Sequence, residues 1–167
     1  MIKKAEQSEI ERIADGLLVN LRGELGLPDV IAERWRKEQP ILVKDIDGNP
    51  SYWLVPVASG DRLVGFLRLG LEGVLLAYGR FGQWRKLCDF PPLSYLSNEN
   101  AEREIYKAFG DSHEEISPPR LVHDGPVDRI AWLSKGRSVD GTKMLLFWTF
   151  GTSYSRPEGE EPEYGLL

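Results

Sequence analysis

The chain has 167 residues, of which 41% are hydrophobic and 28% charged, so it suits one compact domain or two very small ones and is not disordered or fibrous. Its 21 basic and 26 acidic residues give a formal net charge of -5. Residues 157–167 hold four glutamates and no lysine or arginine, which leaves a charge of -1 on residues 1–156. We expect a flexible acidic tail over residues 157–167 after one nearly neutral domain. Without a basic surplus, that domain does not favour nucleic acid as a partner.

The cysteine content and the hydropathy point to a cytoplasmic chain. Cys88 is the one cysteine of the sequence, so no internal disulfide forms and a reducing compartment is compatible. Acidic residues from Glu6 onward interrupt the apolar stretch that a signal peptide needs. The most apolar span, residues 63–78, contains Arg68 and Glu72 and is too short for a membrane helix. We therefore expect no membrane partner.

The first 40 residues predict two helices. Ser8 and Glu11 match a capping box, and apolar residues then recur at intervals of three and four as far as Leu25. Pro28 opens a second short helix that carries Trp35 on its inner side. From residue 41 the pattern changes to strand-length apolar and aromatic runs at residues 41–47, 52–58, 62–69 and 74–78. Because short turns separate these runs, they predict an antiparallel meander.

The second half repeats this order. Ser97 or Asn98 caps a helix that ends at Gly110, and strand-like runs follow at residues 120–123, 129–134 and 143–150. We therefore predict an α+β fold, with amphipathic helices packed on antiparallel β-meanders. Trp53 and Trp132 hold corresponding places in the two meanders. One interpretation is a duplicated helix–meander unit with halves 1–90 and 91–156; the other is a single domain over residues 1–156 without duplication.

The helix and the runs Tyr52–Val57 and Gly60–Phe66 resemble the cystatin-like propeptide and PepSY-type domains over residues 8–80. In that group an antiparallel sheet wraps a helix. The resemblance implies a binding or inhibitory module, including one that regulates a peptidase. It carries no catalytic residue over to this chain.

The sequence offers little for catalysis or for a cofactor. A nucleophile elbow and a phosphate-binding loop are both missing from it. The neighbours Leu87 and Phe90 predict that Cys88 is buried, where a thiol behaves as a small hydrophobe. We expect no cofactor. Trp53, Trp132 and Trp148 fit two interpretations equally well in the sequence: they line a small-ligand site, or they are residues of the core.

Two imidazoles and several carboxylates lie close together in sequence. One hypothesis is that Asp111, His113, Glu114, His123 and Asp124 are ligands of a metal ion, although their spacing matches no established ligand pattern. The alternative is a polar loop at residues 111–115 and an ordinary strand residue at His123.

The strongest candidate for binding follows the first meander. There, cations and aromatic residues, which are enriched at interfaces, interleave at Arg80, Phe81, Trp84, Arg85 and Lys86. The alternative places Phe81 and Trp84 in the core, with Arg85 and Lys86 reaching solvent. Our leading hypothesis is a non-catalytic cytoplasmic binding module for a protein or peptide. Its competitor is a metal- or small-ligand-binding enzyme or sensor that uses the His113 and His123 region.

Overall fold

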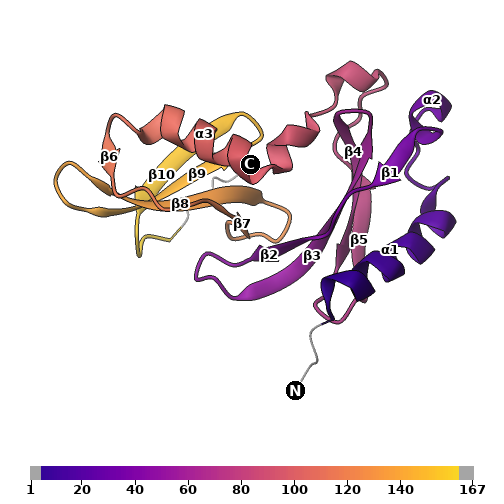
Figure 1. The fold of residues 1–167 in the computed structure, drawn as a ribbon, viewed down its shortest axis with the longest axis horizontal. Coiled ribbons are helices and arrows are strands. Elements are labelled where there is room, and N and C mark those ends of the chain that lie inside the picture. Colours follow the sequence, from indigo (N-terminus) through magenta and orange to yellow (C-terminus); the bar gives the residue numbers. More distant parts are fainter. Residues whose placement is uncertain (1–4, 162–167) are drawn as a thin grey trace. The chain divides into compact units, whose positions relative to one another are not determined.

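The computed structural model describes residues 5–161, which form two compact units (Figure 1). The first unit contains residues 5–43 and 50–94, and the second contains residues 44–49 and 95–161. The boundary between the units after residue 94 lies four residues beyond the predicted boundary between the halves at residue 90. The short segment 44–49 belongs to the second unit. Helices and antiparallel strands are combined in each unit, which confirms the α+β class.

The first unit begins with α1 (Gln7–Leu21), followed by the single turn α2 (Asp29–Ala32). Residues of α1 at intervals of three and four are buried: Ile10, Ala14, Leu18 and Leu21. The predicted capping box is wrong, because Glu6 is the N-cap and Ser8 lies inside the first turn. The helix also ends at Leu21, four residues before the predicted end. Pro28 does open the second helix, as its N-cap.

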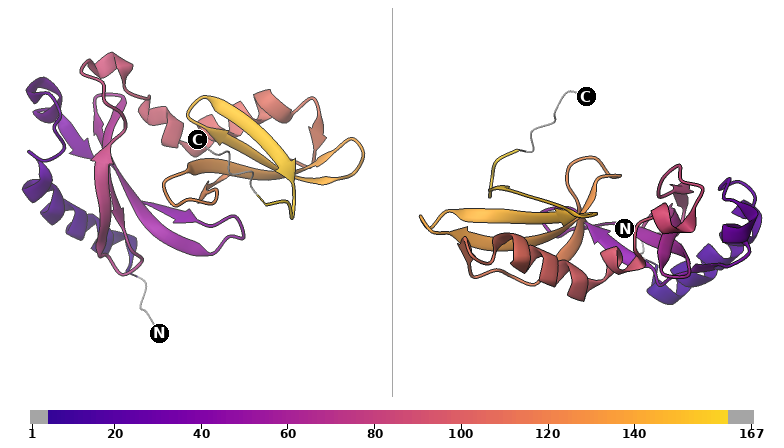
Figure 2. Two further views of the ribbon diagram at one scale, coloured as in Figure 1. Left: turned by 180° about the vertical axis from the view of Figure 1, so that it is seen from behind. Right: turned by 90° about the horizontal axis from the view of Figure 1, so that it is seen from above.

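Five strands complete the first unit: β1 (Trp35–Lys37), β2 (Ile41–Lys44), β3 (Pro50–Ser59), β4 (Arg62–Leu69) and β5 (Leu75–Arg80). Strands β3, β4 and β5 form the predicted antiparallel meander. Trp35 was expected on a helix, but it starts β1, which pairs with the end of β3. The core forms where α1 packs on one face of the meander and covers Val55, Val64 and Leu67 (Figure 2).

The second unit contains α3 (Asn98–Phe109), β6 (His113–Glu114), β7 (Arg120–His123), β8 (Ile130–Ser138), β9 (Lys143–Thr149) and β10 (Thr152–Pro157). Helix α3 begins as predicted, because the Ser97 hydroxyl accepts a hydrogen bond from the Asn100 amide. Gly110 ends it, also as predicted. The helix covers one face of the strands and packs mainly on β9 (Figure 2).

The structure places the first residues of the expected acidic tail in regular structure. Pro157 is the last residue of β10, and the Glu158 amide donates to the Lys143 carbonyl. The Glu158 carboxylate also forms an ion pair with Lys135. Residues 162–167 of that predicted tail lie outside the described residues.

The two units share one topology. Each has a helix, then a short strand, then four strands that neighbour one another in sequence order, β2-β3-β4-β5 and β7-β8-β9-β10. The short strand pairs with the second of these four strands in both cases, β1 with β3 and β6 with β8. The register also agrees, since residues five and six positions after Trp53 and after Trp132 pair with the short strand. A duplicated helix–meander unit would have this topology.

The shared register also relates two aspartates that lie eight residues before these tryptophans. The amide of Asp45 donates to the Asn49 carbonyl, and the amide of Asp124 donates to the Arg129 carbonyl, both at 2.9 Å. Each aspartate therefore closes the turn that leads into the Trp-bearing strand. Their side chains differ: that of Asp45 accepts from Asn49 at the surface, whereas Asp124 is fully buried.

Asp124 anchors β10 to the turn between β7 and β8. Arg156 donates to both of its carboxylate oxygens, at 2.7 and 2.9 Å, and the Tyr154 hydroxyl donates at 2.7 Å. The Arg156 guanidinium also lies 4.7 Å from the centre of the Phe147 ring. Burial by itself raises the pKa of Asp124, but the hydrogen bonds from Arg156 and Tyr154 and the nearby positive charges outweigh it, so the pKa is lowered.

Among the residues that the structure describes, no helix is long and apolar enough to cross a membrane.

We expect Asp124→Ala to cost about 3–5 kcal/mol of unfolding free energy, because it removes the counter-ion of the largely buried Arg156. The matched control is Asp45→Ala, at the topologically equivalent position near the surface, with an expected cost of about 1 kcal/mol. Urea unfolding followed by circular dichroism measures both. Equal losses of unfolding free energy for the two variants would contradict a large contribution of the buried ion pair to stability.

The lowered pKa of Asp124 also predicts a dependence of stability on pH. A depressed folded-state pKa gives stability that is complete above the unfolded value of about 3.9 and is lost as the pH falls through the folded value. The difference in unfolding free energy between wild type and Asp124→Asn should therefore shrink as the pH is lowered from about 5 to about 2. Urea titrations of both proteins across this range provide the measurement. A constant difference would contradict the assignment.

Candidate interaction surface

Strand β5 presents an open edge in the first unit. It pairs with β4 alone, and no strand within residues 5–161 pairs with its other edge. Arg80 at its end is its one charged residue. Val74 just before the strand and Leu76 and Tyr78 within it are 56%, 57% and 41% exposed. An extended apolar strand with unpaired backbone groups is a template for pairing with another chain.

The equivalent strand of the second unit, β10, is protected against such pairing. Its sequence from Thr152 is mostly polar, it ends at Pro157, and the buried Asp124–Arg156 pair fixes it. Polar residues and proline are the usual means by which proteins block an edge strand. Of the two equivalent last strands, β5 is therefore the one whose edge lacks such protection.

Arg80, one of the residues predicted to bind a partner, forms hydrogen bonds within its own chain. One guanidinium nitrogen donates to the Gly26 carbonyl at 2.9 Å, and the other donates to the Trp84 carbonyl. The guanidinium also lies 5.8 Å from the centre of the Phe90 ring. Arg80 thus holds the following segment, which we call loop 81–86, against the first unit.

The two aromatic residues of loop 81–86 differ in exposure. Phe81 is half-buried and meets Phe66 edge-on, with ring centres 5.5 Å apart, as the core alternative predicts. Trp84 is 41% exposed and touches Phe90 edge-on. Its ring lies so close over Gly82 that a Cβ there would fall 1.8 Å from it. The Trp84 ring therefore packs against Gly82 and Phe90, and part of the ring is still exposed to solvent.

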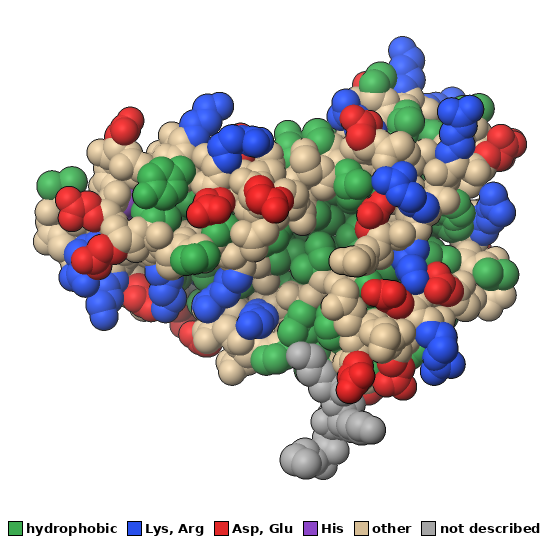
Figure 3. Space-filling view, viewed as in Figure 1, with side chains coloured by type: hydrophobic (Ala, Val, Ile, Leu, Met, Phe, Trp, Pro, Cys, Tyr) green, Lys and Arg blue, Asp and Glu red, His purple; other side chains and the backbone are tan. Residues whose placement is uncertain are grey.

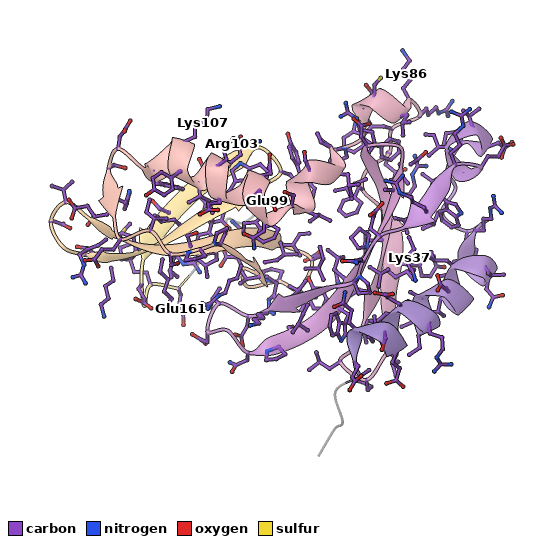
Figure 4. All side chains as sticks on the ribbon, viewed as in Figure 1. Lys37, Lys86, Glu99, Arg103, Lys107 and Glu161 are labelled. Carbon is purple, nitrogen blue, oxygen red and sulfur yellow. The ribbon has the colours of Figure 1, made fainter. Side chains whose placement is uncertain are left out.

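Arg85 and Lys86 also belong to the exposed part of loop 81–86. Both are exposed, and neither forms an ion pair with the described residues. Lys86 points away from the ribbon (Figure 4). Beyond the loop, the chain is fastened again where Arg62 donates to the Phe90 carbonyl and the Leu63 amide donates to the Pro91 carbonyl. The two cations therefore project from a segment that is held at both ends.

Cys88 is exposed, so the prediction of its burial is wrong. It lies in the 3-10 turn η1 (Leu87–Asp89). Residues three apart share one side of such a turn, which directs Leu87 and Phe90 inward and Cys88 outward.

The metal candidates do not come together. His113 pairs with Ser138 and His123 pairs with Ile130, at opposite ends of β8. At about 3.3 Å per residue, these positions are about 26 Å apart along the strand. Asp124 is already bound to Arg156. Within residues 5–161, no group of three His, Cys, Asp or Glu side chains is placed to hold a metal ion, and so Asp111, His113, Glu114, His123 and Asp124 form no joint site.

The remaining candidates belong to the core or to a solvated surface. Trp53, Trp132 and Trp148 are all at most 6% exposed, with Trp53 in the core of the first unit and the other two paired across β8 and β9. The outer face of α3 carries acidic and basic side chains side by side, among them Glu99, Arg103 and Lys107 (Figures 3 and 4). Mixed charges at this spacing are typical of a solvated helix face.

Comparison of the chain with protein-family models, curated proteins and solved structures gives no match. The candidate surface therefore rests on its own residues: the open edge of β5, with Val74, Leu76 and Tyr78, and the exposed Trp84, Arg85 and Lys86.

We expect Arg80→Ala to loosen loop 81–86, because it removes the hydrogen bonds to Gly26 and Trp84. Amide hydrogen exchange of residues 81–90 should become about tenfold faster or more. Arg85→Ala, a neighbouring arginine without such bonds, is the control and should leave the exchange unchanged. Equal exchange in wild type and Arg80→Ala would mean that other contacts hold the loop.

Proposed function

We propose that this chain is a non-catalytic binding module that receives an extended segment of a protein or peptide at the open edge of β5. The observation that carries the proposal is the combination of an unpaired backbone edge with exposed apolar side chains along one short strand. Strand addition of this kind draws affinity from backbone hydrogen bonds and specificity from the side chains that flank them.

Loop 81–86 supports the proposal because it lies at the carboxyl end of β5. A segment bound along β5 would meet the fixed ring of Trp84 and the two cations Arg85 and Lys86 at that end. Tryptophan and arginine are the residues that contribute most to binding energy at protein interfaces. The segment that fits is therefore apolar, with an acidic residue at the end that faces loop 81–86.

Two finer parts of the proposal rest on the sequence. A peptidase as the partner follows from the resemblance of residues 8–80 to cystatin-like propeptide and PepSY-type domains. Location in the cytoplasm fits the exposed thiol of Cys88, which a reducing compartment keeps free. We favour the binding module over the competing enzyme or sensor, because His113 and His123 pair with opposite ends of β8.

Affinity capture from a lysate of the source organism tests the proposal. Tagged wild type, Leu76→Lys and the double variant Trp84→Ala, Arg85→Ala serve as baits, with Val139→Lys as the matched control. Val139 is 91% exposed at the turn between β8 and β9, far in sequence from β5. We expect a protein that wild type and the control retain and that the other two baits lose, because a lysine on an edge strand opposes strand pairing.

Thermal unfolding of each bait shows whether it is folded. Capture of the same proteins by all four folded baits would contradict a site at β5. Where a captured protein is a peptidase, its activity with and without added chain tests the regulatory part of the proposal.

A further inference from the structure

We propose that the segment received by β5 is β5 of a second copy of this chain, paired antiparallel across a two-fold axis. The inference rests on the proposed function and names its partner. Three properties of the strand and its flanks support it: the direction of their charges, their apolar side chains, and the protection of the equivalent strand β10.

The charges that flank β5 are arranged for pairing with themselves. Glu72 precedes the strand, whereas Arg85 and Lys86 follow it. None of these three side chains forms an ion pair with the described residues. Antiparallel pairing brings the beginning of one strand to the end of the other. The acidic flank of each copy therefore meets the basic flank of its partner, and two-fold symmetry produces this contact twice.

The apolar side chains are complementary in the same arrangement. In a pairing centred on Ala77, Leu76 of one copy lies opposite Tyr78 of the other, and the reverse contact is identical. Aromatic residues opposite aliphatic ones are favourable cross-strand pairs. The Tyr78 hydroxyl already donates to Glu24 at 2.7 Å, which fixes the ring before any pairing takes place. The edge thus offers an ordered surface to its own copy.

Protection of β10 explains why such pairing would stop at two copies. Pairing of β5 with β5 uses the open edge of both chains. The equivalent strand β10 ends at Pro157 and is fixed by the Asp124–Arg156 ion pair, so it does not continue the pairing. An isologous contact of this kind closes a dimer rather than extending a fibre.

The test is the mass of the full chain in solution, measured by sedimentation equilibrium over a range of concentrations. Wild type and the control Val139→Lys should form a dimer of twice 18.9 kDa. Glu72→Lys and the double variant Arg85→Glu, Lys86→Glu should each raise the dissociation constant by about tenfold or more, because each brings like charges together. Leu76→Lys should weaken the dimer in the same way.

Mixing the two charge variants gives the decisive result. In the pairing centred on Ala77, position 72 of each copy lies opposite Gly82 of the other, beside loop 81–86. The lysine at position 72 of one variant therefore lies beside the loop that carries the glutamates of the other, and Glu72 of the second lies beside the loop that carries Arg85 and Lys86 of the first. Equimolar mixture should therefore restore a dimer within about threefold of the wild-type dissociation constant. A mixture that stays monomeric overturns the antiparallel pairing, as does a wild-type chain that is monomeric throughout or a dimer that Leu76→Lys leaves intact.

Failure of this inference is distinguishable from failure of the proposed function. A monomeric chain that captures another protein through Leu76 leaves the proposed function standing and overturns only the second copy as its partner. A monomeric chain with no Leu76-dependent capture overturns both.

Discussion

The backbone of an edge strand imposes the constraint on which the rest of this structure depends, because its outward amides and carbonyls need water, a protecting feature or another chain. The second unit meets this constraint within itself. Its last strand, β10, is polar, ends at Pro157 and is held by the buried ion pair between Asp124 and Arg156. The first unit leaves the same need open at β5, where the exposed residues are apolar and the one charge, that of Arg80, is bound to the unit's own backbone. The candidate interaction surface follows from this difference.

Corresponding positions along the two strand series, β2-β3-β4-β5 and β7-β8-β9-β10, therefore carry different chemistry on one topology. Asp45 and Asp124 both close the turn before the Trp-bearing strand, yet the first accepts only local hydrogen bonds and the second anchors a strand 32 residues away in sequence. The short strands β1 and β6 keep the same register on their partners, although one begins with Trp35 and the other with His113. Backbone pairing requires only an extended chain at these positions, so the side chains are free to differ. Two segments can therefore share this topology with different side chains at corresponding positions.

The sequence was most informative where local signals coincide. The bounds of β4 and β7 match the prediction, because turn residues flank apolar runs there, and α3 starts where Ser97 supplies a cap. The short strands β1 and β6 were missed because they are defined by partners distant in sequence, and β10 was missed because its sequence is mostly polar. The metal hypothesis failed for the reverse reason. His113 and His123 are close in sequence, but β8 separates their pairing positions by its full length. For Cys88, composition predicted burial, whereas the three-residue turn set its direction.

The candidate site was recognisable in the sequence as a run of cations and aromatic residues. Which of these cations bind the chain itself and which are exposed depends on where β5 ends. Arg80 is the last residue of the strand, so its side chain can reach back to Gly26 and forward to Trp84, whereas Arg85 and Lys86 lie beyond the point where the chain is held. An arginine in this position orders the loop without adding its charge to the exposed surface. The exposed positive charge therefore lies beyond the carboxyl end of β5, whereas the negative charge of Glu72 lies before its amino end. A strand with such polarity distinguishes the two directions in which another strand can pair with it. That is why the antiparallel arrangement, and not the parallel one, agrees with its charges.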